Sequence, residues 1–440
     1  MTIKKWLALF VCFFAFVPRY VSARDLQSLR VLYVGDAGSE REQAVSGFLK
    51  QYVKGIDTAS RDAFQPASAN DYDVVVLDWP QGPWDQGQDW GAHLISPLGP
   101  REKWTKPTVL LGSAGLNLAV AWQARGGSGC TCLKPLAYGL RDHEIFDKPF
   151  KVDRTKTISI ATPESFQGEI KDPNIDVLPL VDDTTQNWRP GWCTYAFDFP
   201  ANPDIEYFCG GVNMKTSTAA GLWRQGNLLH FGFEQSPLEM NQNGRNLLLN
   251  SIAYISRFNQ DRPIAQTPSP FAGRVASSRD RVVSRFAEYK MDWLKRWIPE
   301  GFAPDLAQRL DAMDQPGLVA WAKENSKYLR PDENNQLCVD DDLRSMNMTF
   351  DQPEFLVHVV ELLRGSAEDQ ARGHRLAARY LPDMPADSAQ SAAAWLTENR
   401  PYLFASDAGI YRWYIDPLAK QRGVAWKDLR GPKREDIPGA

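Results

Sequence analysis

Short apolar runs and helical stretches alternate along the chain between Leu29 and Phe258. The segments with helical periodicity are 41–52, 116–123 and 244–258. Four runs are almost wholly apolar: 30–35, 73–78, 107–112 and 227–232. Uninterrupted Val and Leu runs are typical of strands that are covered on both faces. The pattern therefore predicts a doubly wound, mostly parallel, flavodoxin-like α/β sheet within residues 24–260.

The rest of the chain has a different pattern. Residues 261–278 are rich in Pro, Ser and Ala, which indicates a linker. Helical patterns dominate residues 279–440, so we expect an all-α C-terminal domain. Within it, a W-x2-EN-x2-YL pattern at 321–329 recurs at 395–403, 74 residues later. We interpret this as a duplicated helical unit with a structural role. Chance similarity of two helix ends, or contact with a protein partner through residues 280–440, are the alternatives.

The N-terminus has the pattern of a signal peptide. Lys4 and Lys5 precede the apolar stretch Trp6–Val17, and Val21-Ser22-Ala23 supplies small residues at a cleavage site. The stretch is too short for a permanent membrane span. We therefore expect residues 1–23 to be a signal peptide and the protein to be periplasmic or extracellular, with uncleaved anchoring as the alternative. No later apolar run reaches 18 residues, so no transmembrane segment is expected after cleavage.

Charge and cysteine content narrow the possible partners. The chain of 440 residues has a formal net charge of −4, and loss of Lys4, Lys5 and Arg19 with the signal peptide makes it −7. An acidic protein lacks the positively charged surface that nucleic-acid binding requires, so we expect no nucleic-acid partner.

Five cysteines remain after cleavage, an odd number that leaves at least one without an intrachain partner. They are Cys130, Cys132, Cys193, Cys209 and Cys338.

The pair Cys130-Thr-Cys132 has three interpretations. It could bind a soft metal, form a redox-active disulfide of its own, or pair with other cysteines such as Cys193 or Cys209. No second pair of Cys or His with metal-site spacing lies nearby, so we predict no metal site. No cofactor motif is present either, and we expect no cofactor.

A candidate nucleophile follows the apolar run at 107–112. Gly112-Ser113-Ala-Gly115 lies between a predicted strand and a predicted helix. Small residues at such a turn can raise a nucleophile above the sheet, and Ser113 stands at the nucleophile position of G-x-S-x-G. Leu111 replaces the first Gly of that motif. Tight packing at a strand-to-helix turn is the simpler explanation for these small residues.

Three segments resemble a known family. They are the first strand ending in Gly35-Asp36, the turn at 112–115, and the block 229–237 with the helix that follows it. Together they resemble the class I glutamine-amidotransferase-like superfamily, most closely its trehalose-utilisation-type (ThuA-like) branch, over residues 28–258. The resemblance implies an amidotransferase-like sheet.

The same resemblance argues against amidotransferase activity. The catalytic members need Cys at the turn and His-Pro-Glu after the last strand, whereas this chain has Ser113 and Gly232-Phe233-Glu234. A nucleophile without an adjacent base stays protonated and weak. His230 lies two residues before Gly232 and shares its strand face. A displaced catalytic set of Ser113, His230 and Glu234 is therefore the remaining enzymatic candidate.

Tryptophans follow the predicted strand at 73–78. Open α/β sheets bind ligands at the carboxyl ends of their strands, and flat indole faces suit a sugar ring. A loop that buries its own tryptophans is the alternative. The candidate ligand-binding residues are Asp36, Trp79, Trp84, Trp90 and Trp104.

These observations favour an exported, non-amidotransferase ThuA-like protein. It would bind a small polar ligand, with carbohydrate as the favoured class, and carry a helical interaction domain. One alternative is a hydrolase of sugar or ester substrates that uses Ser113 with Glu234. Another is a scaffold protein of the cell envelope. The sequence leaves open whether the chain catalyses any reaction.

Overall fold

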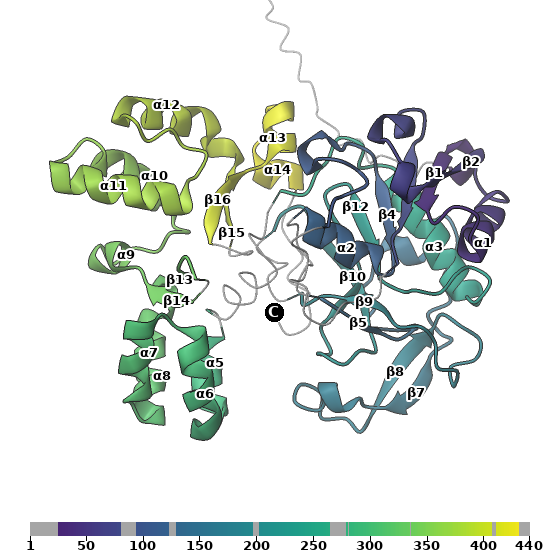
Figure 1. Cartoon of the computed structure of the whole chain (residues 1–440), viewed down its shortest axis with the longest axis horizontal. Coiled ribbons are helices and arrows are strands. Elements are labelled where there is room, and N and C mark those ends of the chain that lie inside the picture. The colour runs from purple at the N-terminus through teal and green to yellow at the C-terminus, as the bar shows by residue number, and fades with distance from the viewer. Residues whose placement is uncertain are drawn as a thin grey trace, which may run out of the picture.

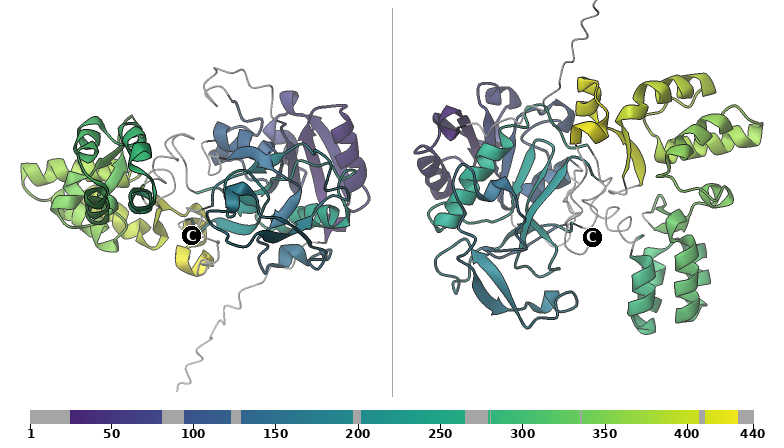
Figure 2. Two further views of the ribbon diagram at one scale, coloured as in Figure 1. Left: turned by 90° about the horizontal axis from the view of Figure 1, so that it is seen from below. Right: turned by 180° about the vertical axis from the view of Figure 1, so that it is seen from behind.

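The computed structural model describes residues 25–80, 94–122, 129–196, 202–264, 279, 281–334, 336–406 and 411–430. The expected signal peptide and residues 265–278 of the expected linker lie outside these ranges. An α/β region and a C-terminal region of helices lie side by side (Figure 1), and two further views show the same arrangement (Figure 2). None of the helices in the described ranges combines the length and hydropathy needed to cross a membrane.

The α/β region is built on one ten-stranded sheet with the order β2-β1-β3-β4-β12-β11-β10-β6-β8-β7. The first five strands in this order are parallel to one another. Four of the five coincide with the apolar runs of the sequence, which confirms the α/β fold class. The strands are β1 (Arg30–Gly35), β2 (Gly55–Ser60), β3 (Val74–Asp78), β4 (Thr108–Leu111) and β12 (Leu228–Phe231).

The other half of the sheet is antiparallel, so the sheet is mixed and not mostly parallel. The sequence pattern missed these strands because polar residues and glycines interrupt four of them, and β6 has only three residues. They are β6 (Leu136–Tyr138), β7 (Ile158–Ala161), β8 (Asn174–Pro179), β10 (Ile205–Gly211) and β11 (Ala220–Gln225). A separate two-stranded ribbon pairs β5 (Cys130–Leu133) with β9 (Gly191–Cys193).

Helices cover both faces of the parallel half. Tyr33 of β1 belongs to the core that contains α1 (Glu40–Leu49) and α3 (Gln242–Ile255), whereas Leu32 packs in the core that contains α2 (Ala114–Ala121). Successive strand residues point to opposite faces, so β1 serves both cores. Short 3₁₀ turns connect the elements: η1 (Leu26–Ser28), η2 (Arg61–Ala63), η3 (Pro66–Ala69), η4 (Arg101–Lys103), η5 (Glu144–Phe146) and η6 (Glu164–Phe166).

The C-terminal region is helical, as expected, and has two cores of its own. It also contains two short hairpins that the sequence pattern did not indicate. The helices are α5 (Val282–Glu288), α6 (Met291–Gly301), α7 (Pro304–Asp311), α8 (Gln315–Asn325), α9 (Asp341–Ser345), α10 (Pro353–Leu362), α11 (Ala367–Tyr380), α12 (Ala389–Asn399), α13 (Pro417–Arg422) and α14 (Trp426–Arg430). The hairpins are β13 (Leu329–Pro331) with β14 (Leu337–Val339), and β15 (Leu403–Ser406) with β16 (Arg412–Ile415).

Both copies of the W-x2-EN-x2-YL pattern adopt the same local structure. Each helix, α8 or α12, runs into a 3₁₀ turn, η8 (Ser326–Tyr328) or η9 (Arg400–Tyr402), and then into a hairpin. The Asn325 side-chain amide donates to the Trp321 carbonyl at 2.9 Å, and Asn399 donates to the Trp395 carbonyl at 2.8 Å. The shared spacing of Trp and Asn therefore corresponds to one repeated helix end.

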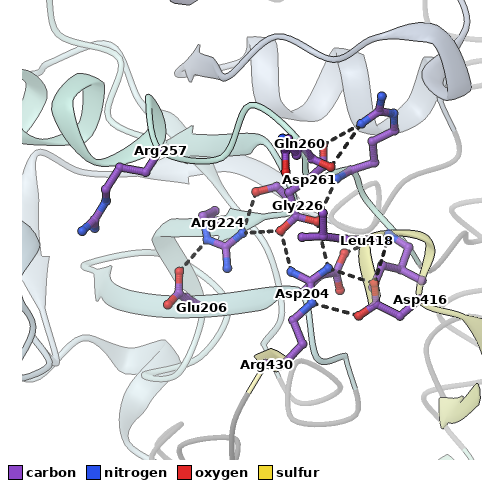
Figure 3. Close-up of polar contacts among 12 residues, drawn as sticks. Asp204, Glu206, Arg224, Gly226, Arg257, Gln260, Asp261, Asp416, Leu418 and Arg430 are labelled. Carbon is purple, nitrogen blue, oxygen red and sulfur yellow. Dashed lines mark hydrogen bonds and ion pairs between the residues drawn. The ribbon is translucent and has the colours of Figure 1, made fainter. Parts of the chain in front are cut away.

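A buried ion cluster joins the C-terminal region to the α/β region (Figure 3). The guanidinium of Arg430 in α14 contacts Asp261 at 2.8 Å and Asp416 at 2.9 Å. Asp261 also contacts Arg224 of β11 at 3.3 Å. Burial opposes ionisation of Asp261, but hydrogen bonds and charge from Arg430 lower its pKa. The cluster therefore ties the last helix to the sheet through paired charges.

Candidate functional site

The turn between β4 and α2 has glycine at its most strained position. Gly112 has a φ of +49°, whereas Ser113 has an ordinary φ of −62° and is the N-cap of α2. A Cβ atom on Gly112 would collide with the carboxylate of Glu234. A nucleophile elbow places its nucleophile at the strained residue. Here that position cannot carry a side chain, and Ser113 is one residue further on.

Glu234 follows β12 and reaches the same turn. Its Oε2 accepts hydrogen bonds from the Ser113 amide at 3.0 Å and from the Ser113 hydroxyl at 3.2 Å. Its Oε1 accepts no hydrogen bond from any residue that the structure describes and lies 3.6 Å from Arg189 Nε and 3.9 Å from Arg41 Nη2. Glu234 is only 2% exposed, and this burial raises its pKa despite the two arginines.

A second buried carboxylate lies beside Glu234, at the end of β3. Asp78 Oδ2 accepts from Arg41 Nε at 2.7 Å and from the Tyr33 hydroxyl at 2.6 Å. Asp78 Oδ1 is buried and has no hydrogen-bond partner in the part of the chain that the structure describes. Burial, reinforced by Asp78, raises the pKa of Tyr33, so its hydroxyl stays protonated as a donor. Arg41 also donates to the Glu234 carbonyl at 2.5 Å, which links the two carboxylates.

Asp36 lies at the same edge of the sheet and is more exposed to solvent than Asp78 and Glu234. It follows β1 and pairs with Arg61 at 2.7 Å, and Arg61 donates to the Asp78 carbonyl at 3.4 Å. The Asp36 side chain is 50% exposed, whereas that of Asp78 is 4% exposed. The carboxyl ends of β1, β3 and β12 thus hold polar side chains that range from exposed to buried. We call Asp36, Arg41, Arg61, Asp78, Arg189 and Glu234 the edge cluster.

His230 does not join Ser113. Its ring stacks on that of Trp223, its partner on β11, with centroids 3.8 Å apart and planes within 3°. Neither ring nitrogen has a hydrogen-bond partner among the described residues. Burial lowers the His230 pKa to about 3, so the ring is neutral at neutral pH. The structure thus brings Ser113 together with Glu234 but leaves His230 in an aromatic layer, which corrects the expected pairing.

The four candidate tryptophans differ in where they lie. Trp104 is 3% exposed, and its indole N–H donates to Thr108 at 2.9 Å. It is a core residue, which corrects its assignment to a ligand-binding rim. Trp79 is partly buried, and its carbonyl accepts from Asn117. Trp84 and Trp90 lie outside the described residues.

Sequence reasoning missed most of the edge cluster. Asp78 ends a predicted strand just as Asp36 does, so the same position rule could have found it. Arg41 stands in the first turn of a predicted helix, where a charged residue usually faces water. Arg61 and Arg189 lie outside the predicted elements and carried no signal.

The edge cluster offers acceptors and charged donors for a polar ligand. Within the described ranges, the group of His, Cys, Asp or Glu side chains close enough to share a metal ion is Cys130, Cys132 and Cys193, none of which belongs to the edge cluster. Cys130 and Cys132 form a disulfide with each other. Cys193, Cys209 and Cys338 are free thiols, so the alternative pairing with Cys193 or Cys209 is not formed.

The similarity of this chain to known proteins lies among solved structures. No protein-family model and no curated protein matches the chain. Among solved structures, it is similar to a "putative GMP synthase" subunit from Thermoplasma acidophilum. That match has 10% sequence identity and a TM-score of 0.31, and covers 53% of this chain and 96% of the other. The ThuA-like relationship therefore remains a proposal that rests on the motifs of the sequence.

Proposed function

We propose that this chain is an exported ThuA-like protein without amidotransferase activity that binds a small polar ligand at the edge cluster. The favoured ligand class is carbohydrate. Support for the site comes from its position, because open α/β sheets bind ligands outside the carboxyl ends of their strands.

The single observation that carries the proposal is a pair of unsatisfied buried acceptors. Asp78 Oδ1 and Glu234 Oε1 are both buried, and neither accepts a hydrogen bond from a residue in the described ranges. Leaving such an atom without a donor costs about 1–3 kcal/mol. A ligand whose hydroxyl groups donate to both atoms would recover this cost.

The charges of the edge cluster favour a neutral ligand. Asp36, Asp78 and Glu234 face Arg41, Arg61 and Arg189, three acidic against three basic side chains. A strongly anionic or cationic ligand would meet like charges as well as opposite ones. Neighbouring hydroxyls of a sugar can donate to a carboxylate and accept from a guanidinium at the same time.

A binding screen tests the proposal. We expect the intrinsic tryptophan fluorescence of the full chain to change with at least one member of a panel of neutral mono- and oligosaccharides. Glu234→Gln should weaken that response, because an amide replaces the carboxylate in the cluster. Glu239→Gln, on an exposed side chain five residues later, is the matched control and should respond like wild type. If no saccharide in the panel changes the tryptophan fluorescence of wild type, that result would contradict carbohydrate binding.

A hydrolase remains the second candidate because of one contact. The Ser113 hydroxyl donates to Glu234 Oε2 at 3.2 Å, and the raised pKa of Glu234 suits a carboxylate that takes up a proton. A fluorophosphonate probe should then label wild type but not Ser113→Ala. Absence of labelling would rule out a hydrolase that uses Ser113 as its nucleophile.

The export and partner proposals rest on other parts of the chain. The proposal of export rests on the pattern of residues 1–23, and N-terminal sequencing of the exported protein should find residue 24 first.

For the C-terminal region we propose a role in contacting a protein partner. A partly exposed row of stacked rings on and before α6 supports it, with Tyr289, Trp293 and Trp297 at centroid spacings of 4.3 and 5.6 Å. A scaffold protein would use these contacts and no ligand at all.

A further inference from the structure

Three cysteine sulfurs gather on the ribbon formed by β5 and β9. Cys130 and Cys132 are two positions apart on β5, and Cys193 on β9 lies directly opposite Cys130 in the antiparallel register. The Sγ atoms of Cys132 and Cys193 are 3.9 Å apart, and all three Sγ atoms lie within 4.8 Å of one another. The fold thus creates a cluster that sequence spacing hides, since Cys193 lies 61 residues beyond Cys132.

We propose that, when the disulfide between Cys130 and Cys132 is reduced, these three sulfurs bind one Cu(I) ion. A metal–sulfur bond of about 2.3 Å places the sulfurs of a trigonal site about 4 Å apart. The distance between the Cys132 and Cys193 sulfurs already has this value. The Cα atoms of Cys130 and Cys132 are 5.7 Å apart, so their sulfurs can separate without movement of the backbone.

The chemistry of the three cysteine ligands favours Cu(I) over other cations. Soft thiolate ligands favour Cu(I), zinc and iron–sulfur clusters. Structural zinc sites almost always have four protein ligands, whereas the described residues place three sulfurs together and add no His, Asp or Glu within the same reach. Three thiolates and no oxygen or nitrogen ligand match the soft, low-coordinate Cu(I) ion better than zinc.

The surroundings of the sulfurs suit a site that is closed on one side. Cys193 is fully buried in the core, and Cys130 and Cys132 are partly exposed beside it. The amide of Met214 donates to Cys132 Sγ at 3.5 Å. Such outer hydrogen bonds orient metal ligands. A cation can therefore approach from the side of Cys130 and Cys132 while Cys193 anchors it from within.

The disulfide makes the site dependent on redox state. A dithiol reductant donates two electrons and two protons: the bond between Cys130 Sγ and Cys132 Sγ breaks, each sulfur becomes a thiol, and the reductant closes to its own disulfide. Binding of Cu(I) then releases the thiol protons to solvent as the thiolates form. In the oxidised protein two of the three ligands are occupied by their mutual bond.

The test is a competition titration on the full chain. Reduced protein, freed of reductant without oxygen, is mixed with Cu(I) held by the coloured chelator bicinchoninate. We expect wild type to withdraw one equivalent of Cu(I) and the oxidised protein to withdraw none. Cys132→Ser should weaken binding at least tenfold. Cys338→Ser, which changes a thiol outside the cluster, should bind like wild type.

Cys132 is partly exposed, so its replacement is safer for folding than that of buried Cys193, and circular dichroism of each variant checks the fold. The proposal fails if folded, reduced wild type leaves all the Cu(I) with the chelator. It also fails if folded Cys132→Ser withdraws as much Cu(I) as wild type, or if the reduced protein binds Zn²⁺ but not Cu(I).

Discussion

Glu234 Oε2 accepts hydrogen bonds from both the amide and the hydroxyl of Ser113, at 3.0 and 3.2 Å. This contact joins the end of β12 to the start of α2 and places the carboxylate against Gly112, where a side chain would collide with it. Its other oxygen lies near Arg41 and Arg189 and accepts no hydrogen bond from the described residues. Ser113 therefore holds Glu234 in position at the edge of the sheet.

Glu234→Gln should change the pH dependence of stability. The folded protein holds the Glu234 proton to higher pH than the unfolded chain, because burial raises its pKa above the ordinary 4.5. The stability contributed by the protonated group is full below pH 4.5 and is lost as the pH rises through the folded pKa. Urea unfolding should show wild type losing stability relative to Glu234→Gln as the pH rises from 4. Parallel profiles for the two proteins would contradict this.

His230→Phe should make the protein less sensitive to acid. Burial holds the folded pKa of His230 at about 3, below its ordinary 6.5. Between these values the unfolded chain binds the extra proton, so wild type loses up to about 1.4 kcal/mol per pH unit as the pH falls below 6.5. Phe keeps a ring against Trp223 and leaves no unpartnered nitrogen. Urea midpoints between pH 7 and pH 4 measure the difference, which should be absent if His230 is charged in the folded protein.

Arg430→Met should loosen the C-terminal region from the α/β region. The substitution keeps an apolar stem but leaves Asp261 and Asp416, which are 2% and 0% exposed, without this partner. Removing one member of a buried ion pair costs about 3–5 kcal/mol. The measurement is the urea midpoint together with the rate of limited proteolysis between the two regions. Arg422→Ala removes an exposed contact to Gln260 in the same area and should leave both values near wild type.

The same substitution should destabilise both copies of the repeated unit, and more so the second copy, where Asn399 Oδ1 also accepts from Lys420 at 2.7 Å. Asn325 and Asn399 are 4% and 1% exposed, and each donates to the carbonyl of the Trp four residues earlier. Replacing either by Ala should therefore cost about 0.5–1.5 kcal/mol, because the partly buried hydrogen bond to the Trp carbonyl is lost. Thermal unfolding of the two variants measures this. A loss confined to one copy would show that the units are not equivalent.

The sequence predicted the elements that are apolar throughout. β1, β3, β4 and β12 lie in the middle of the sheet, so their Val and Leu runs follow directly from burial on both faces. β10 escaped prediction because Glu206, Gly210 and Gly211 break its apolar pattern, and its place is set by pairing with β11 and β6. Such long-range pairing leaves no local signal.

The candidate site was only partly visible for the same reason. Asp36 was identified by its position after a predicted strand, and Glu234 by the resemblance of Gly232-Phe233-Glu234 to the family's His-Pro-Glu motif. The expectation for His230 rested on strand parity, which assigns a face but not the neighbour that occupies it. That neighbour is Trp223, from a strand the pattern did not reveal. Arg41 and the gathering of Cys193 with Cys130 and Cys132 depend on the tertiary fold in the same way.

Calorimetric titration of Asp78→Asn with a saccharide that binds wild type tests the central claim most directly. The variant keeps the size of the side chain but replaces a carboxylate whose Oδ1 has no partner among the described residues. Losing one hydrogen bond to a charged group costs about 1.5–3 kcal/mol, so binding should weaken by about 10- to 100-fold. Asp57→Asn, on the exposed strand β2, should bind like wild type. Equal affinities of Asp78→Asn and wild type would contradict ligand binding at the edge cluster.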